Sequence, residues 1–306
     1  MNKVKINRSA AIGAAFILFL TFINVSAEKS NLKLIEKRNI SVNQENVFIL
    51  KSGGGDIKIN TWERPEILIK IYGNSKARKS FKFHIIKDKN SIILEGKKHD
   101  SSIFNWFSNP RLMYEITLPT LFNSNLLTSG GDVRVSGISG ESDISTSGGD
   151  IFVSDGKGNV NAKTSGGDIK ISYFNGSADL ATSGGDILCN RTSGDIDAKT
   201  SGGDIKIISS RGSISARTSG GDINVDYSGV NKGIELYSSG GDISVKIPLN
   251  FSALAELKTA GGEIFLNLQN TKTIKKSKYS LVAKINSGSE PLICKTIGGD
   301  ITILEK

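Results

Sequence analysis

The chain has 306 residues, a formal net charge of +9, 34 glycines and two cysteines. No segment after about residue 30 is apolar enough to cross a bilayer as a helix, which excludes a helical membrane protein with several spans. Whether the two cysteines pair depends on where the repeat pattern places them.

The first segment has the features of a secretory signal. Three basic residues precede an apolar run from about residue 10 to residue 23, and small residues end the segment at Ala27. We expect cleavage after Ala27 and an exported protein that is periplasmic, on the cell surface or secreted. An uncleaved anchor is the alternative, but the run is short for a span and is interrupted by Thr21 and Asn24.

The charge is unevenly distributed along the rest of the chain. Basic and acidic residues number 17 and 10 in residues 28–131, 12 and 17 in residues 132–269, and 7 and 3 in residues 270–306. Basic flanks on an exported protein predict an envelope or surface partner, such as an anionic polymer, lipid head groups or a membrane protein, and no nucleic acid. The alternative is a solvated, lysine-rich surface without a partner.

Residues 28–131 are expected to cap a larger structure. Segments such as "NVFILKSGGGDIKI" and "EILIKIYG" alternate apolar and polar residues, which predicts strands of irregular coils. The loop from Lys97 to Arg111 adds three aromatic residues. Their expected role is to cover the first coil or to contact a partner, and they are Phe104, Trp106 and Phe107.

Residues 132–269 contain a motif, Ser-Gly-Gly-Asp-Ile, that returns every 18 residues. Six aspartates from Asp132 to Asp222 keep this period, and looser turns follow at Asp242, Glu263 and Asp300. Self-similarity at such a period indicates a solenoid. Counting each Asp as position 1, positions 2, 4, 11 and 13 are apolar or small, and position 9 is glycine. The pattern predicts a single parallel β-solenoid of two facing sheets, all-β, with two glycine corners in each 18-residue coil.

The Gly-Gly-Asp corners have a structural explanation that needs no ligand. Glycine at a corner supplies a positive φ, which we expect at Gly203 and its equivalents, and the carboxylate accepts hydrogen bonds from turn amides. Calcium binding and a glycosidase carboxylate pair are the alternatives, but the second corner lacks regular acids and no pair of aspartates is singled out. The residues of this predicted turn motif are Gly131, Asp132, Gly149, Asp150, Gly167, Asp168, Gly185, Asp186, Gly203, Asp204, Gly221, Asp222, Gly241 and Asp242.

The repeat register also places the cysteines and the threonines at defined positions of the coil. Cys189 takes inward position 4, and Cys294 takes inward position 13 of the coil that begins at Glu263, four coils later. The expected axial separation is roughly 19 Å, beyond disulfide reach, so we predict two buried free thiols. The threonines at position 15 share the inward parity, which argues against an ice-binding face.

Residues 270–306 are expected to form a basic insertion followed by a final coil. Four lysines lie in the insertion, which resembles a hairpin arm with a role in partner contact; they are Lys272, Lys275, Lys276 and Lys278.

With these motifs in place, the chain resembles the bacterial DUF4097 putative-adhesin family, which is related to head-domain autotransporter-adhesin and toastrack repeats. The resemblance covers nearly all of residues 39–306 and includes "YEITLPTLFNSNLLTSGGDVRV" and "GSEPLICKTIGGDITI". It implies an exported β-solenoid without enzymatic activity and without a cofactor, and it carries over no catalytic residue. We therefore expect an adhesin-like or cell-envelope binding scaffold. A polysaccharide-active β-helix enzyme and a calcium-stabilised repeat protein are the alternatives.

Overall fold

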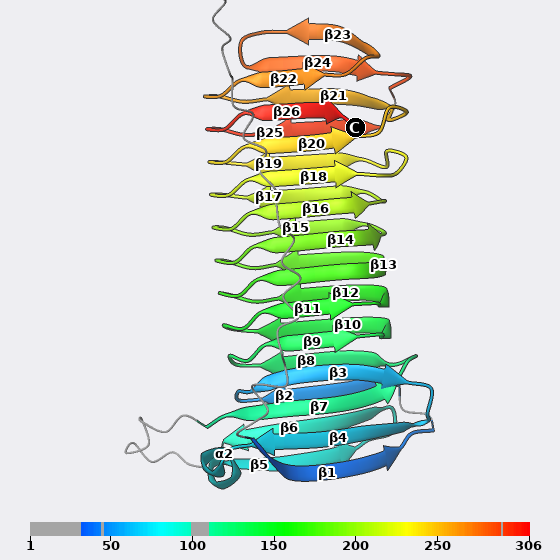
Figure 1. Ribbon diagram of the computed structural model, residues 1–306, viewed down its shortest axis with the longest axis vertical. Helices are drawn as coiled ribbons and strands as arrows, with labels where there is room; N and C mark the ends of the chain where they lie inside the picture. Colours follow the sequence, from blue (N-terminus) through cyan, green and yellow to red (C-terminus); the bar gives the residue numbers. More distant parts are fainter. Residues whose placement is uncertain (1–31, 44–45, 99–109, 289) are drawn as a thin grey trace, which may run out of the picture.

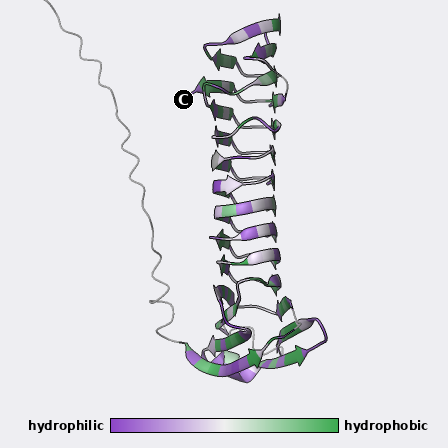
Figure 2. Ribbon diagram, turned by 90° about the vertical axis from the view of Figure 1, so that its right-hand side faces the viewer, coloured by the Kyte–Doolittle hydropathy of each residue, from purple (hydrophilic) through white to green (hydrophobic). Residues whose placement is uncertain are grey.

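The protein is a narrow stack of β-coils, which the computed structural model describes for residues 32–306 except 44–45, 99–109 and 289. The described strands form one 26-stranded sheet system that folds back on itself as two facing layers (Figures 1 and 2). The predicted signal, residues 1–27, and the predicted aromatic contact residues Phe104, Trp106 and Phe107 lie outside the described residues. No helix in the described part of the chain is long and apolar enough to span a membrane.

The strands follow the repeat along the chain. The N-terminal end is built from β1 (Lys33–Ser41), β2 (Val47–Ser52), β3 (Asp56–Trp62), β4 (Glu66–Gly73), helix α2 (Ser75–Ser80), β5 (Phe81–Lys87), β6 (Ser91–Lys98) and β7 (Leu112–Pro119). The regular array contains β8 (Asn123–Thr128), β9 (Val133–Ser136), β10 (Ser139–Thr146), β11 (Ile151–Ser154), β12 (Lys157–Lys163), β13 (Ile169–Ala181), β14 (Ile187–Ser193), β15 (Ile196–Lys199), β16 (Ile205–Ser210), β17 (Ile214–Thr218), β18 (Ile223–Tyr227) and β19 (Ile234–Ser238). The C-terminal end comprises β20 (Ile243–Ile247), β21 (Ala253–Lys258), β22 (Ile264–Asn267), β23 (Thr271–Lys276), β24 (Ser280–Ile285), β25 (Pro291–Lys295) and β26 (Ile301–Glu305).

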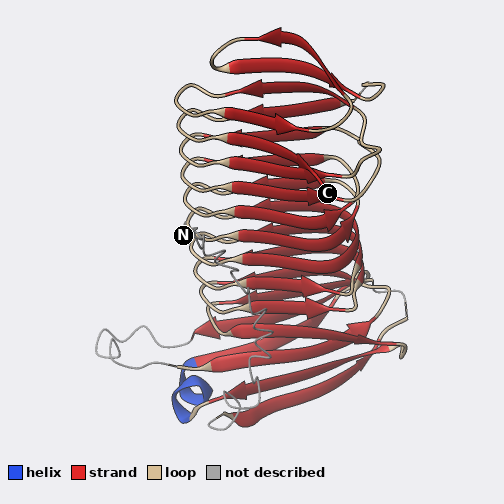
Figure 3. Cartoon of the chain, turned by 45° about the horizontal axis from the view of Figure 1, so that its top comes forward, coloured by secondary structure: helices blue, strands red, loops and turns tan. Residues whose placement is uncertain are grey.

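Each regular coil contributes one strand to each of two parallel sheets. We name the sheet whose strands follow the aspartates the Asp sheet, which includes β9, β11, β14, β16 and β18. The opposite sheet, whose strands lead to a Thr or Ser just before the corner, is the Thr sheet, which includes β10, β12, β15, β17 and β19. The long strand β13 contributes to both. Figure 3 shows the corners aligned along one side of the stack.

Burial alternates along the strands as the period-2 pattern predicts. Ile169 and Ile171 at positions 2 and 4 are fully buried, and so is Leu180 at position 13 of the same coil, in the Thr sheet. The inner face of the Thr sheet mixes small residues such as Ala198 with larger ones such as Ile196, while that of the Asp sheet is mostly Ile and Val. The fold class and the inward positions predicted from the sequence are therefore confirmed.

Two hydrogen-bond ladders hold the Gly-Gly-Asp corners together. The Oδ1 atom of Asp186 accepts from the backbone amide of Asp204 at 2.8 Å, and the same contact recurs from coil to coil. The hydroxyl of Thr200 donates to the carbonyl of Gly185 at 2.9 Å in the preceding coil and accepts from the amide of Gly203 at 3.3 Å. The corner motif therefore satisfies its own backbone groups, with the aspartate carboxylates accepting from amides. The threonines are buried, as their predicted inward direction requires.

The prediction of positive φ is correct for one corner and wrong for the other. At the second corner, the position 9 glycines have φ between 114° and 159°; they are Gly140, Gly158, Gly176, Gly194 and Gly212. Gly203 has no positive φ. It is glycine for another reason, because a Cβ there would clash with the carbonyl oxygen of Gly185 and lie 2.6 Å from Asp186 Oδ1. At the first corner, glycine is therefore required by the close stacking of neighbouring coils and not by its backbone conformation.

The order of coils in space differs from their order in the sequence at both ends. The C-terminal strands β25 and β26 lie between earlier coils, because β25 pairs with both β19 and β21, and β26 pairs with both β20 and β22. The C-terminus consequently lies within the stack (Figure 1). At the other end, β2 lies between β6 and β8, and β3 lies between β7 and β9. Beyond the inserted coils, antiparallel strands close each end of the stack. Examples are β1 paired with β4 and β5 paired with β6 at one end, and β24 paired with β21 at the other.

This insertion changes the predicted distance between the cysteines. Cys294 lies beside Leu236 and Leu257 in the Thr sheet, three strands from Ala198. At ~4.8 Å for each strand, the axial separation from the Cys189 coil is about 14 Å. The expected value of roughly 19 Å is therefore wrong by one coil. Both thiols are buried and unbridged, in agreement with the prediction.

Candidate binding face

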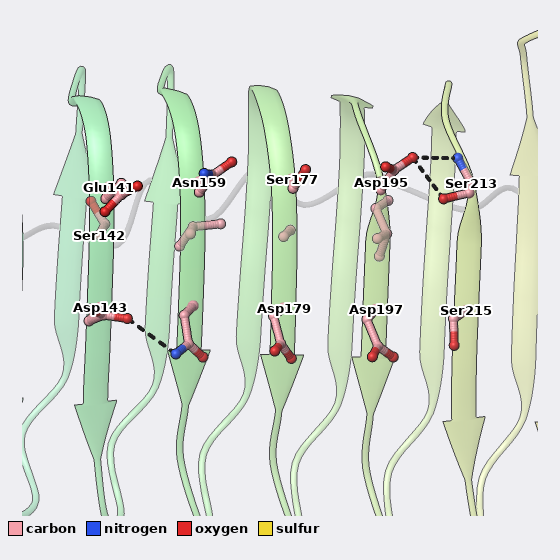
Figure 4. Close-up of a pocket in the computed structure, with 14 residues that line it drawn as sticks. Glu141, Ser142, Asp143, Asn159, Ser177, Asp179, Asp195, Asp197, Ser213 and Ser215 are labelled. Carbon is pink, nitrogen blue, oxygen red and sulfur yellow. Dashed lines mark hydrogen bonds between the residues drawn. The ribbon is translucent and has the colours of Figure 1, made fainter. Parts of the chain in front are cut away.

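The outer surface of the Thr sheet carries a polar depression across five consecutive strands, β10, β12, β13, β15 and β17. Its volume is about 380 Å3. Two rows of side chains at outward positions 10 and 12 line it, one residue from each coil, and Figure 4 shows both rows running across the strands. The rows are Glu141, Asn159, Ser177, Asp195 and Ser213, and Asp143, Asn161, Asp179, Asp197 and Ser215. We call this surface the acidic face.

The acidic face exists because the parallel register is regular. Asp143 pairs with Asn161, Asn161 with Asp179, and Asp179 with Asp197, so identical outward positions of successive coils become direct neighbours. Neighbouring parallel strands lie about 4.8 Å apart. Five carboxylates thus gather on one surface although they are spread over 57 residues, from Glu141 to Asp197.

Some of these side chains fix one another. Asn161 donates to Asp143 Oδ1 at 3.1 Å, and Asp195 Oδ1 accepts from the Ser213 hydroxyl at 2.7 Å and from the Ser213 amide at 3.0 Å. Two buried oxygens, Asn161 Oδ1 and Asp197 Oδ1, have no hydrogen-bond partner among the described residues.

The hydrogen bonds also determine the charge of one carboxylate. The Ser213 hydroxyl, followed by the Ser213 amide, lowers the pKa of Asp195, because both stabilise the ionised form. Asp195 therefore stays ionised at neutral pH and cannot serve as a general acid. A glycosidase pairs one protonated carboxyl group with one ionised carboxylate, and an ionised Asp195 meets only the second requirement.

A row of cations borders the acidic face. Lys199 Nζ lies 2.7 Å from Asp197 Oδ2, and Arg217 lies 3.9 Å from Asp197 and 3.7 Å from Glu235. These pairs neutralise one edge of the face. Glu141, Asp143 and Asp179 form no ion pair with any other described residue, so the negative charge is concentrated on the side away from Lys199.

The outer surface of the Asp sheet has a different character. Phe152 lies between two cations of neighbouring strands, with the Arg134 guanidinium 4.8 Å and the Lys170 ammonium 6.0 Å from its ring centroid. Arg134 is also paired with Asp132 at 3.0 Å. Cation–π contacts and ion pairs satisfy these groups within the protein, so this surface is a weaker candidate for a binding site.

The predicted functional residues do not meet at one place. The corner aspartates are engaged in the ladder on one side of the stack, while Lys275, Lys276 and Lys278 lie on or beside β23 at the C-terminal end. The described residues contain no group of three or more His, Cys, Asp or Glu side chains arranged to hold a metal ion. The five carboxylates of the acidic face were missed, although acids at position 12 in three of the five coils are the sequence signal that reveals them.

Comparison with known proteins gives one assignment. The family model described as "Toastrack DUF4097" matches residues 35–211 and 196–304. No curated protein matches the chain.

The solved structures that match this chain share little sequence with it. One is described as a putative adhesin from Bacteroides fragilis NCTC 9343, with 15% identity, a TM-score of 0.41, and coverage of 89% of this chain and 97% of that one. Another is a putative adhesin from Parabacteroides distasonis ATCC 8503, with 13% identity, a TM-score of 0.41, and coverage of 90% and 97%. A third, described as a putative lipid binding protein from the same strain, has 13% identity, a TM-score of 0.38 and the same coverage. Because the family model covers most of the described chain, the protein belongs to the Toastrack DUF4097 family.

Proposed function

We propose that this protein is a noncatalytic, exported β-solenoid that acts as an adhesin-like binding scaffold of the cell envelope. The observation that carries the proposal is the acidic face, in which polar side chains repeat at the strand spacing across five coils. A repeated row of hydrogen-bond acceptors suits a long polymer that carries hydrogen-bond donors at regular intervals. The fold supports the row rigidly, because each strand is bonded to a neighbour on both sides.

The chemistry of the acidic face favours two kinds of ligand. Carboxylate, amide and hydroxyl groups accept hydrogen bonds from the hydroxyl groups of a neutral glycan, and the carboxylates attract a cationic polymer. An anionic polymer is disfavoured there by repulsion from Asp143, Asp179 and Asp197. The ligand class that we assign to this face is therefore a hydroxylated polymer that is neutral or positively charged.

A polysaccharide-active enzyme is the rival function. It would require one carboxyl group with a raised pKa beside an ionised one, and Asp195, whose pKa is lowered, supplies only the ionised member. The regular spacing also gives each neighbouring pair of coils a similar geometry, so no pair of carboxylates is set apart.

The proposal is tested with purified protein on immobilised dextran, chitosan and alginate, which are neutral, cationic and anionic. We expect binding to be strongest with chitosan and weakest with alginate. Asp179→Asn combined with Asp197→Asn should weaken chitosan binding at least about tenfold, because two directly adjacent charges are removed. The control is Asp155→Asn combined with Glu290→Gln, which removes the same charge elsewhere and should leave binding unchanged.

Two results would overturn the proposal. New reducing ends in the polysaccharide after incubation would identify an enzyme. Equal binding to all three polymers, unaffected by the Asp179 and Asp197 substitutions, would show that the acidic face is not the binding site.

A further inference from the structure

The C-terminal end of the stack is closed by the antiparallel hairpin of β23 and β24. Strand β24 pairs with β21 on one side and with β23 on the other. Strand β23 pairs with β24 alone, so it is the outermost strand of the Thr sheet at this end (Figure 1). The exposed side chains of this hairpin therefore form the surface of the rod at this end.

The hairpin has a high positive charge that no acidic residue in the described part of the chain neutralises through an ion pair. Between Glu263 and Glu290 the chain contains five lysines and no acidic residue. All five are exposed, and none forms an ion pair with a described residue; they are Lys272, Lys275, Lys276, Lys278 and Lys284. Elsewhere in the stack several cations are paired, as Lys199 is with Asp197. The end of the rod thus differs electrostatically from its sides.

Two of these lysines are direct neighbours across the hairpin. Lys272 of β23 pairs in register with Lys284 of β24, and both side chains are exposed. Like charges directly opposite one another on antiparallel strands destabilise the pair. A bound anion between them would remove this repulsion.

Apolar side chains accompany the lysines. Ile274 is 60% exposed at the point where the β23 register shifts, between Thr273 and Lys275, and Tyr279 at the turn is 39% exposed. Lysines on an edge strand can serve only to prevent pairing with other chains. That role does not explain an isoleucine exposed beside them on the same edge, because an apolar edge residue promotes association.

We propose that the β23–β24 hairpin docks the C-terminal end of the rod onto an anionic phospholipid bilayer. The lysines contact the head-group phosphates, while Ile274 and Tyr279 enter the interfacial region, where amphipathic and apolar side chains are favoured. A bilayer fits these observations better than a soluble anionic polymer, because the hairpin combines charge with exposed apolar side chains at the end of the rod. This proposal goes beyond the adhesin-like function and does not depend on the ligand of the acidic face.

The size of the expected effect follows from the charge. A lysine close to an anionic membrane surface strengthens binding about fivefold. Replacing three of the five lysines should therefore weaken vesicle binding on the order of 100-fold at low ionic strength. The effect should decrease as salt screens the surface.

The test is co-sedimentation of the purified protein with vesicles of phosphatidylcholine alone and with vesicles that also contain phosphatidylglycerol. We expect binding only to vesicles that contain phosphatidylglycerol. The vesicle affinity of K275Q/K276Q/K278Q should be lower on the order of 100-fold. In I274S, the part of vesicle binding that persists at high salt should be weaker. The control triple variant, K157Q/K163Q/K246Q, lowers the net charge equally on the sides of the rod. It should change binding less than about threefold. Circular dichroism verifies that each variant keeps the fold.

Each other outcome would overturn the proposal. Equal losses in the two triple variants would mean that net charge alone attracts the membrane. Complete competition by soluble polyphosphate, with no effect of I274S, would identify a site for anionic polymers. Self-association that disappears in the hairpin variant, without vesicle binding, would identify an interface between copies. Chitosan binding by the acidic face is measured separately, so it can succeed or fail independently.

Discussion

The Oδ1 atom of Asp186 lies 2.8 Å from the backbone nitrogen of Asp204, which donates a hydrogen bond to it from the next coil. Asp204 repeats the contact with the amide of Asp222 at 2.8 Å. Because each carboxylate receives a backbone donor from its neighbour, the row of aspartates is part of the fold, and repulsion between neighbouring carboxylates is offset by charge-assisted hydrogen bonds.

The first prediction concerns this acceptor. Asp204→Asn retains a side-chain oxygen for the Asp222 amide, so it should cost less than about 1 kcal/mol of unfolding free energy. Asp204→Ala removes the acceptor and should cost about 1–2 kcal/mol. Urea unfolding measures both costs, and hydrogen exchange at the Asp222 amide should accelerate in the alanine variant alone. An equal cost for asparagine and alanine would show that the charge, which both variants lack, and not the acceptor stabilises the corner.

The second prediction separates the two glycines of one corner. Gly203→Ala places a methyl group against the Gly185 carbonyl and should cost about 1–3 kcal/mol, because backbone atoms must move. Gly202→Ala is the matched control, since its nearest atom, the Gly184 carbonyl oxygen, is 3.5 Å away. It should change stability by less than about 1 kcal/mol. Similar shifts in the urea midpoint for the two variants would contradict the close-stacking explanation.

The third prediction concerns the buried threonines. Thr200→Val keeps the shape but removes the hydroxyl that bonds Gly185 and Gly203, leaving two backbone groups without partners. We expect a loss of about 1–3 kcal/mol. Thr200→Ser keeps the hydroxyl and loses one methyl group, so it should cost at most about 1 kcal/mol. Thermal melts of the two variants test this order, and the reverse order would mean that methyl packing matters more than the hydrogen bonds.

The fourth prediction concerns pH. Burial raises the pKa of Cys189 from 9.0 to about 12, because the thiolate is excluded from the apolar core. The folded state therefore keeps its proton where the unfolded state loses it, so stability is full below about pH 9 and decreases as the pH rises toward about 12. Urea unfolding between pH 8 and pH 11 measures this decrease.

Cys189→Val supplies the control, since valine occupies the same inward position at Val153 and Val225. Its stability should decrease less steeply in the alkaline range. An identical pH dependence in the variant would assign the decrease to other groups, such as Tyr114, whose pKa burial also raises to about 12. In the native protein at pH 8, Cys189 should resist alkylation until denaturant is added.

The regular array could be predicted from the sequence because its determinants are local and repeated. Alternation at positions 2 and 4 places Ile169 and Ile171 in the core, and the same period places Thr200 inside. The predicted acceptor role of the corner aspartates required only that successive coils stack in register. The candidate site was harder to predict from the sequence. The acidic face depends on which outward side chains are left without partners in the protein, and only the side-chain contacts in the structure show which these are.

The sequence by itself determined the 18-residue coil, the two sheets and the inward face of each strand, because a side-chain period of two and a recurring corner leave one way to bury the apolar residues. The tertiary structure alone decided the order of coils at the ends. Strands β25 and β26 enter between coils that precede them. The Ile-Gly-Gly-Asp-Ile corner makes the same ladder contacts as the other corners, because the Asp300 amide donates to Asp242 Oδ1 and Asp300 Oδ1 accepts from the Glu263 amide. A repeat pattern specifies how a coil pairs, but not which of several similar coils becomes its neighbour, so that choice depends on the antiparallel strands that close each end.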